Sequence, residues 1–280
     1  MLALLAFTLA LAVALALVGL ALGPDRYLFV LLAPALVLRR ARRYLLDFVP
    51  FALLIAVYAE ARGLAHILHP DPYYLPHLEA ERLLFGGLVP PVALQEWLWS
   101  GALTWFDSLT VDVTRVHSIV PPTLAFALWV TRRALFYRFA ATFLTLSFAA
   151  AVTFWLYPAA PPWAAAEKGV IDSITRLTKV ESGTVSAGGA GTLADPNPYA
   201  AIPSLHGGYA FLVFLFVATV LWRTRYRPLV PLAALYPLMQ SFAAVYTGNH
   251  YVVDLVIGFA YATAALYGVR WLWRRLGWPE

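Results

Sequence analysis

The sequence predicts an all-α fold, a polytopic bundle of membrane-spanning helices. Hydrophobic residues make up 61% of the 280 residues, charged residues make up only 12%, and the mean hydropathy is +0.71. A soluble domain of this size could not bury so much apolar surface. Apolar runs recur along the chain, and short arginine-rich clusters separate them. We therefore expect an integral membrane protein with six core transmembrane helices and one or two additional N-terminal helices.

The apolar runs divide the chain into an N-terminal part and a main membrane domain. Most of them approach the roughly 20 residues that a helix needs to cross a bilayer. In chain order they are Leu2–Leu22, Tyr27–Leu38, Leu45–Leu68, Leu109–Val130, Phe139–Leu156, Leu205–Trp222, Leu229–Tyr246 and Tyr251–Trp273. We expect residues 1–43 to contribute N-terminal membrane helices and residues 44–280 to form one membrane domain.

The first two runs differ in length. Leu2–Leu22 has no basic segment before it and is longer than the apolar part of a usual signal peptide, so we expect a retained span. Tyr27–Leu38 is too short to cross a bilayer by itself. Together they predict either two spans or one span followed by an interfacial helix.

Four arginine clusters predict how the spans are oriented. They lie within residues 39–43, 132–138, 223–227 and 270–275. Two apolar runs separate each neighbouring pair, so all four clusters can lie in the cytoplasm at once, as the positive-inside rule favours. This arrangement predicts a multi-pass protein of the cell membrane, with both termini in the cytoplasm and the segments 70–108, 158–202 and 247–249 on the extracytoplasmic side.

The two long connecting segments differ in composition. Residues 70–108 are rich in Trp and Leu and carry few charges, which predicts short helices lying in the membrane interface. Residues 158–202 are rich in Gly, Pro, Ser and Ala, which predicts a long extracytoplasmic loop. We expect the centre of this loop, Glu181–Leu193, to be mobile.

Charge and cysteine content exclude several classes of function. The net charge is +5, but the basic residues lie mainly between apolar runs, so the expected partner is the lipid bilayer and no nucleic acid. There is no cysteine, which excludes disulfides and thiolate metal sites. His66, His69 and His77 lie near carboxylates and could suggest zinc, but the intervening proline-rich stretch argues against it. We expect no metal, no cofactor and no obligatory protein partner.

A first polar pair stands at the start of the last apolar run. His250 and Asp254 are four residues apart and share one face of a helix. The carboxylate can hold one ring nitrogen of the histidine and leave the other free as a nucleophile or base. Since ionisable residues inside a membrane span are costly, a functional role is favoured over simple helix packing.

A second polar group stands at the start of another run. His206 follows Ser204 and precedes Gly207, in the stretch AIPSLHGG. The first N–H groups of a helix bind phosphate well, and the Ser204 hydroxyl can add a donor. Gly207 allows a substrate or a neighbouring helix to come close. His206 could therefore donate a proton to a leaving oxygen beside a bound phosphate.

Further polar residues lie within or near the apolar runs. Asp112 and Arg115 are spaced to form an ion pair on a helix. His117 precedes Pro121 and Pro122, where we expect a kink, and either lines the substrate pocket or makes a packing hydrogen bond. Residues 60–62, which include Glu60 and Arg62, are expected to form a local polar patch, with contact to a substrate headgroup as the alternative.

Together, PSLH at residues 203–206 and His250-x-x-x-Asp254 resemble the type 2 phosphatidic acid phosphatase superfamily. The chain is most similar to the inositol phosphorylceramide synthase-like branch, because YPAAPPW, which begins at Tyr157, and AAIPSLH at 200–206 also resemble segments of that branch. The resemblance covers residues 105–270 and implies that the main domain is catalytic. It implies that His250 attacks phosphorus to form a phosphohistidine, that Asp254 orients His250, and that no metal takes part.

The resemblance also implies a role for His206, which would protonate the leaving group and then activate an acceptor. This sequence departs from the phosphatases of the superfamily at one position. The phosphatases carry an arginine six residues before the second histidine. Here this position is Ala244. The absence of this arginine favours the transferase branch, and it leaves the cations that bind the phosphate unassigned. The candidate cations are Lys168, Arg176, Lys179 and Arg115. Tyr157 is expected to be a further substrate contact.

These features predict a membrane enzyme with its active site at the extracytoplasmic face. The preferred expectation is a phosphotransferase that moves a phosphate-containing headgroup, such as phosphoinositol, from a lipid donor to an alcohol acceptor. A phosphatase that hydrolyses a lipid or polyprenyl phosphate with the same histidines, using water as the acceptor, is the alternative enzyme. A non-catalytic lipid-binding or lipid-moving protein is an alternative of another class, and the presence of His206, His250 and Asp254 together speaks against it.

Overall fold

The computed structural model describes residues 30–68, 70–180 and 197–278. The predicted span Leu2–Leu22 and the predicted mobile segment Glu181–Leu193 lie outside these residues. The helices are α3 (Leu32–Val37), α4 (Ala41–Leu68), α5 (Leu75–Leu84), α6 (Pro90–Leu98), α7 (Trp105–Val116), α8 (Val120–Thr131), α9 (Arg133–Leu156), α10 (Pro162–Glu167), α12 (Leu205–Leu221), α13 (Val230–Tyr246) and α14 (Val252–Arg275). The 3-10 helix η2 (Arg227–Leu229) precedes α13.

The predicted all-α, polytopic membrane fold is confirmed. Four helices, α4, α9, α13 and α14, are long and apolar enough to cross a membrane, and α8 and α12 are shorter apolar helices. Only 28% of the most apolar part of α4 is buried inside the protein, and 50% of that of α9. So much exposed apolar surface on long helices is expected where lipid replaces water as the solvent.

The predicted run Leu109–Val130 is not one kinked helix. It forms α7 and α8, with the break at residues 117–119, one turn before the two prolines. Pro121 and Pro122 have no N–H to donate to the carbonyls of residues 117 and 118, but they fit the first turn of a new helix. The Ser118 hydroxyl turns back to the Arg115 carbonyl, 2.9 Å away, and closes the end of α7. The break leaves His117 between the two helices.

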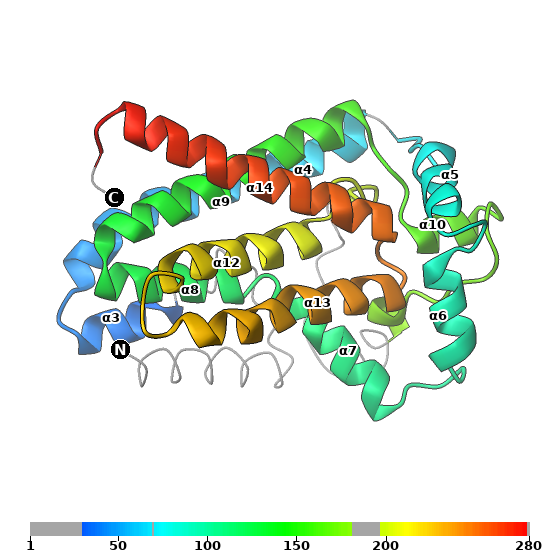
Figure 1. Cartoon of the computed structure of the whole chain (residues 1–280). Coiled ribbons are helices and arrows are strands. Elements are labelled where there is room, and N and C mark those ends of the chain that lie inside the picture. The colour runs from blue at the N-terminus through cyan, green and yellow to red at the C-terminus, as the bar shows by residue number, and fades with distance from the viewer. Residues whose placement is uncertain (1–29, 69, 181–196, 279–280) are drawn as a thin grey trace.

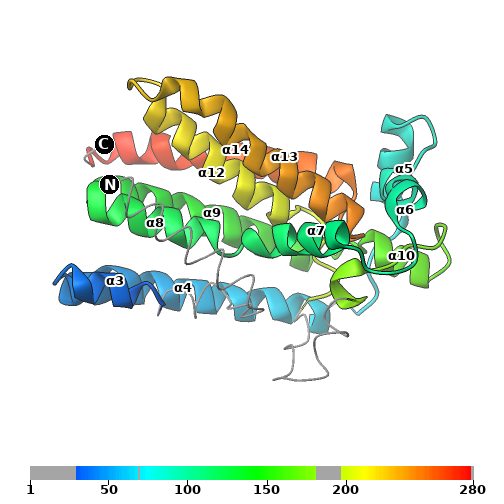
Figure 2. The same cartoon turned by 90° about the horizontal axis from the view of Figure 1, so that it is seen from below.

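Helix α12 is the centre of the bundle. It packs against α13 and α14, and also contacts α8 and α9. Helix α9 packs in turn against α4, α8 and α14, and Figures 1 and 2 show α4 on the outer side of α9. Aromatic rings fill the core between these helices, including stacked pairs such as Phe48 with Phe136 and Phe143 with Tyr209.

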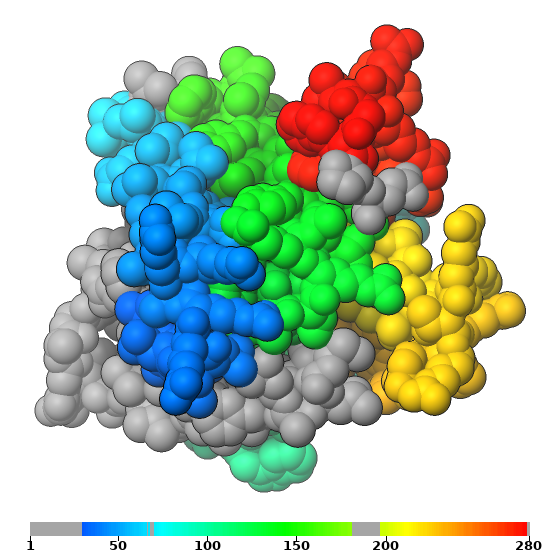
Figure 3. Space-filling view, turned by 90° about the vertical axis from the view of Figure 1, so that its left-hand side faces the viewer, coloured from blue at the N-terminus to red at the C-terminus, as the bar shows by residue number. Residues whose placement is uncertain are grey.

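All four arginine-rich stretches lie at one end of the bundle. Figures 1 and 2 show the start of α4, the α8–α9 junction, the α12–α13 connection and the end of α14 at this end, and α5, α6 and α10 at the other. Figure 3 looks onto the arginine-rich end and shows these parts of the chain on one face. The alternation of spans inferred from the arginines therefore agrees with the fold.

A buried carboxylate ties three helices together near the arginine-rich end. Asp47 of α4 accepts hydrogen bonds from Trp129 of α8, at 2.7 Å, and from Arg133 and Tyr137 of α9, at 2.5–2.7 Å. Its side chain is only 4% exposed, whereas that of Arg133 is 49% exposed. The arginine can stay hydrated while it neutralises Asp47, which lowers the desolvation cost of the pair.

The opposite end is covered by the connecting segments. Residues 70–108 contain the short helices α5 and α6, as expected, which contact α14 and α13, respectively. Isolated β-bridges join Tyr73 to Ala159 and Ala159 to Ala200, so three separate segments run side by side here. Gln95 of α6 bonds to the Tyr246 carbonyl at the end of α13 and to the backbone of Thr175, each at 2.8 Å. These contacts hold the connecting segments in place over the N-termini of α12 and α14.

Candidate active site

Helices α12 and α14 cross in close contact because glycine occupies the contact points. A Cβ atom added at Gly258 would lie 2.3 Å from the Ser204 carbonyl oxygen, and one at Gly208 would lie 3.3 Å from the Gly258 oxygen. At Gly207 the nearest neighbour would be a Leu255 methyl group at 2.8 Å. Small residues allow such approaches between membrane helices. The crossing brings the first turns of the two helices, and their histidines, together.

The two histidines predicted to act together are hydrogen-bonded to each other. Nδ1 of His206 lies 2.9 Å from Nε2 of His250, and Nδ1 of His250 lies 3.4 Å from the Asp254 carboxylate. His250 is 5% exposed and Asp254 is fully buried. A carboxylate facing Nδ1 favours the proton on that nitrogen and leaves the lone pair on Nε2. His206 then donates its Nδ1 proton to this lone pair.

Asp254 has a second partner that fixes its position. Its carboxylate accepts the backbone N–H of Tyr251 at 2.8 Å and so caps the helix that carries it. The distance of 3.4 Å to His250 is longer than a normal hydrogen bond. Asp254 is therefore held by the backbone, and a small movement of the imidazole would close the bond between them.

A third histidine belongs to the same cluster. His117, at the break between α7 and α8, lies with its ring centroid 4.1 Å from that of His206. Its Nδ1 hydrogen-bonds the Thr114 carbonyl. Because a carbonyl only accepts, this bond places the proton on Nδ1 and leaves Nε2 with its lone pair. The structure thus brings His117 to the site, from the helix break that separates α7 and α8.

Ser204 and Gly207 shape the first turn of α12. The Ser204 hydroxyl accepts the Gly207 N–H at 3.3 Å, and the Ser204 backbone N–H donates to the Asp254 carbonyl at 3.0 Å. Ser204 is completely buried and is the N-cap of the helix. In this structure the hydroxyl serves the helix end, and Gly207 faces the neighbouring helix α14.

The positive charges of two arginines act on the histidine cluster. The charges of Arg62 on α4 and Arg176 in the outer loop both act on His206. The Arg176 guanidinium lies 4.5 Å from the centre of the Trp163 ring, and the Trp163 N–H donates to the Gly248 carbonyl, which fixes this loop beside His250. The expectation that Arg62 belongs to a local polar patch, or contacts a substrate headgroup, stays a prediction.

The other predicted cations lie elsewhere. Arg115 forms an ion pair with Asp112 at 3.0 Å, as the spacing predicted. Lys168 and Lys179 are exposed, and within the described residues no hydrogen bond joins either of them to a histidine. Arg176 is thus the one of the four candidates that the fold brings near His206.

The connecting segments that cover this end of the bundle also approach the site. Tyr157 follows α9 and stacks on Tyr73, with ring centroids 4.8 Å apart. Burial, assisted by the charge of Asp254, raises the pKa of the Tyr157 hydroxyl. It is therefore neutral at ordinary pH and could donate a hydrogen bond close to the cluster.

Glu81 of α5 is a further buried group at this end. Its carboxylate accepts the backbone N–H groups of Val252 and Val253, both at 2.9 Å. Burial raises the pKa of Glu81, the two N–H donors lower it, and the charge of Asp254 raises it again. The sequence alone does not predict this contact, because nothing local indicates that Glu81 meets a segment 171 residues away.

Within the described residues, no group of three or more His, Asp or Glu side chains could hold a metal ion. Of the three histidines in the suggested zinc motif, His69 and the side chain of His66 lie outside what the structure describes. His77 hydrogen-bonds the Ala160 carbonyl at 2.8 Å.

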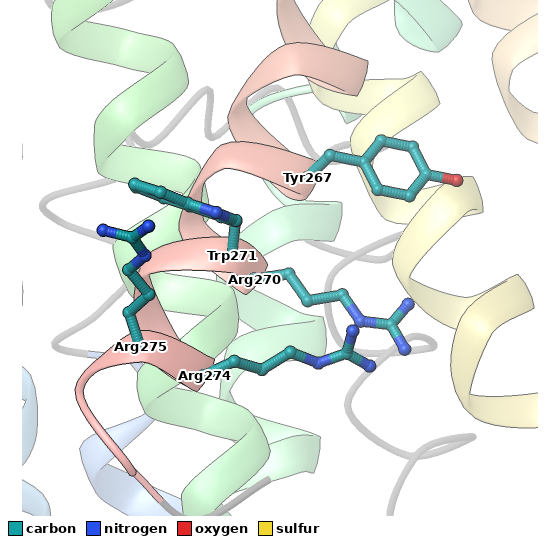
Figure 4. A pocket seen from close by; sticks show the side chains of 5 residues that line it. All are labelled: Tyr267, Arg270, Trp271, Arg274 and Arg275. Carbon is teal, nitrogen blue, oxygen red and sulfur yellow. The ribbon is translucent and has the colours of Figure 1, made fainter.

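A surface cavity of about 510 Å³ lies at the other end of α14. Its lining includes Arg270 and Arg274, which point the same way in Figure 4. It lies at the arginine-rich end, far from the histidines, and is no part of the candidate active site.

The fold and the site together define a class: a multi-pass helical membrane protein with paired histidines at one end of the bundle. A model of the PAP2 superfamily, the type 2 phosphatidic acid phosphatase superfamily, matches residues 88–268, more than half of the chain. The chain belongs to this superfamily, as its motifs had indicated. The match includes His117, His206, His250 and Asp254, and excludes α4 and α5.

A curated relative agrees with the suspected branch. The phosphoinositol dihydroceramide synthase of Bacteroides thetaiotaomicron is 27% identical over 173 residues, which cover 56% of this chain and 52% of the relative. The chain thus matches about half of that relative's length. No solved structure shows a significant match. The family and the relative place this protein among membrane enzymes that handle lipid phosphates.

Proposed function

We propose that this protein transfers a phosphate-containing headgroup from a lipid donor to an alcohol through a phosphohistidine at His250. One observation carries the proposal: His206, His250 and Asp254 lie in a row, with Nδ1 of His206 2.9 Å from Nε2 of His250 and Nδ1 of His250 3.4 Å from the Asp254 carboxylate. A nucleophile, its orienting carboxylate and a proton donor are the groups that two-step phosphoryl transfer requires.

The first step breaks the bond between phosphorus and the donor lipid. The lone pair on Nε2 of His250 attacks phosphorus, and the leaving alkoxide takes a proton from the imidazolium form of His206, which becomes neutral. Asp254 stabilises the positive charge that develops on the His250 ring. Nε2 of His250 and Nδ1 of His206 lie 2.9 Å apart, so the proposed nucleophile and the proposed proton donor face the same point.

The second step regenerates the enzyme. His206, now without its proton, removes a proton from the incoming alcohol, whose oxygen attacks phosphorus. The bond between phosphorus and Nε2 breaks, and its electron pair returns to His250. We propose that Arg62 and Arg176 hold the phosphate oxygens in place of the arginine that the phosphatases carry, because both charges act on His206. Ala244, at that position, is fully buried in a packed cluster.

The acceptor is proposed to be an alcohol, not water. The relative's name describes the synthesis of a ceramide that carries phosphoinositol, which favours transfer. The site is proposed to face the extracytoplasmic side, since it lies at the end opposite the arginine clusters.

The test is label transfer from phospholipids carrying radioactive phosphorus. We expect purified protein to take up label that is acid-labile and alkali-stable, as phosphohistidine is, and to lose it to a new lipid when a lipid alcohol is added. His250→Ala should take up no label. Absence of label in the wild type, or equal labelling of His250→Ala, would refute the covalent mechanism. Release of free phosphate with every acceptor tried would identify a phosphatase.

A further inference from the structure

Two buried carboxylates cap the first turn of α14. Asp254 accepts the N–H of Tyr251 at 2.8 Å, and Glu81 accepts those of Val252 and Val253 at 2.9 Å each. The first N–H groups of a helix have no partner within the helix, and here three consecutive ones end on carboxylates. Carboxylates therefore take up three of the four unpartnered N–H groups at the positive end of α14.

Glu81 is an uncommon residue for capping a helix, both in type and in its distance along the chain. Helices are commonly capped by a neighbouring Ser, Thr, Asp or Asn, whereas Glu81 comes from α5, 171 residues before Val252. It is completely buried beside a second carboxylate, Asp254, whose charge acts on it. Burying two like charges together is costly, so the arrangement requires a compensating role. Glu81 also lies outside the part of the chain that matches the superfamily.

Helix α5 is fixed at a second point on the same face. His77, one turn before Glu81, is 3% exposed and bonds the Ala160 carbonyl at 2.8 Å. Its ring lies 5.2 Å from that of Tyr251, centroid to centroid. Helix α5 therefore joins the start of α14 to the segment that follows α9. His250 directly precedes this clamped turn, so the position of its imidazole depends on the clamp.

We propose that Glu81 is a positioning residue: by holding the Val252 and Val253 amides, it keeps the first turn of α14 where Nε2 of His250 faces His206. This inference rests on the proposed function, because it assigns a further residue to that reaction. Without Glu81, two buried N–H groups would lose their partner and the turn would shift or fray. A displacement of about 1 Å can slow a reaction on the order of 100-fold while leaving substrate binding largely unchanged.

The kinetic test compares Glu81→Gln with Glu79→Gln. An amide keeps the shape of Glu81 but offers one acceptor oxygen, and its NH2 group would face an N–H donor. Glu79 is exposed on the same helix and serves as the matched control. We expect Glu81→Gln to lower kcat for label transfer by about tenfold or more, with KM for the donor changed less than about twofold. Glu79→Gln should behave as the wild type.

A second measurement does not depend on catalysis. In hydrogen–deuterium exchange on the wild type, we expect the Val252 and Val253 amides to exchange slowly, and Glu81→Gln to speed up their exchange more than that of the α14 centre. Fast exchange of these amides in the wild type would overturn the inference, even if the variant failed to fold.

The outcomes separate the two proposals. If the wild type takes up no label, the proposed function fails, and the exchange experiment still tests the clamp. If the wild type takes up label and Glu81→Gln retains the wild-type kcat, the inference about Glu81 alone is wrong. A rise in KM with unchanged kcat would also contradict it, since this would place Glu81 in substrate binding.

Discussion

At the scale of single residues, the site is a row of imidazoles that ends on a buried carboxylate. His117, His206 and His250 are in successive contact, and Asp254 closes the row. Each histidine has a different partner on its other nitrogen: a backbone carbonyl for His117 and a carboxylate for His250. Both partners favour the proton on Nδ1 and leave the lone pair on Nε2, but only His250 has a carboxylate that can stabilise a positive charge on its ring.

The cationic ligands of the phosphate are tested by replacing Arg176. We expect Arg176→Gln to lower the rate of label transfer about 100-fold, because removing one donor to a developing oxyanion has an effect of this order. The matched control is Lys179→Gln, since this exposed lysine lies three residues further along the same loop. It should stay within about twofold of the wild type. Equal losses in both variants would show that the loop acts only through its overall charge.

At the scale of the elements, the active site depends on how closely two helices can approach. The contacts of Gly208 and Gly258 set the distance between α12 and α14 and hence between His206 and His250. The backbone of Ser204 bonds that of Asp254 across this crossing. The two histidine motifs therefore form one packed unit, although His206 and His250 lie 44 residues apart.

The crossing is tested by Gly258→Ala. The new methyl group would lie 2.3 Å from the Ser204 carbonyl oxygen, a backbone atom that can move only if the helices separate. We expect label transfer to fall by at least about tenfold. Gly268→Ala is the control on the same helix, because a Cβ atom there meets nothing within 4 Å. In the helix interior it should be neutral or slightly stabilising. Wild-type activity in Gly258→Ala would disprove the close crossing.

The packing of α4 on α8 and α9 is tested by Asp47→Asn. The change removes the charge that faces Arg133 and turns an NH2 group toward other donors. Since Arg133 is half exposed, we expect a loss of about 2 kcal/mol, seen as a fall of about 5 °C in Tm in detergent. Asp112→Asn, which breaks the pair with Arg115 and whose carboxylate is more exposed than that of Asp47, should lower Tm by less than about 2 °C. Equal changes in Tm would show that the Asp47 network adds no stability.

At the scale of the whole molecule, the two ends of the bundle have opposite characters. One end gathers the arginine clusters, and the other carries α5, α6, α10 and the histidines (Figure 1). This polarity fits a protein that is anchored in one orientation and meets its substrate at the membrane surface. The predicted topology thus assigns the site to the extracytoplasmic side.

The absence of cysteine from the sequence allows a direct test of topology. Ser173 and Thr224 are both exposed, the first in the outer loop and the second between α12 and α13. We expect a membrane-impermeant maleimide to label Ser173→Cys in intact cells, and to label Thr224→Cys only after the membrane is opened. The reverse pattern would place the active site in the cytoplasm.

Hydropathy alone located most of the apolar helices of the described bundle, although the run Leu109–Val130 proved to be two helices. The predicted runs Leu45–Leu68 and Phe139–Leu156 end at the same residues as α4 and α9. This is possible because crossing a bilayer requires a continuous apolar stretch, a property of neighbouring residues. His250 and Asp254 do face each other, at 3.4 Å, but the predicted reason was wrong: His250 lies before Tyr251, the N-cap of α14, so the two residues do not share a helix face. The motifs added the expectation that His206 is their partner.

Contacts between distant segments could be learned only from the folded structure. It brought the charges of Arg62 and Arg176 to act on His206, set the His117 ring beside that of His206, and brought Glu81 to the start of α14. None of these positions leaves a periodic signal, because each depends on how whole helices pack. Hydropathy is local and survives in the sequence, whereas the neighbours of a buried charge are set only when the chain has folded.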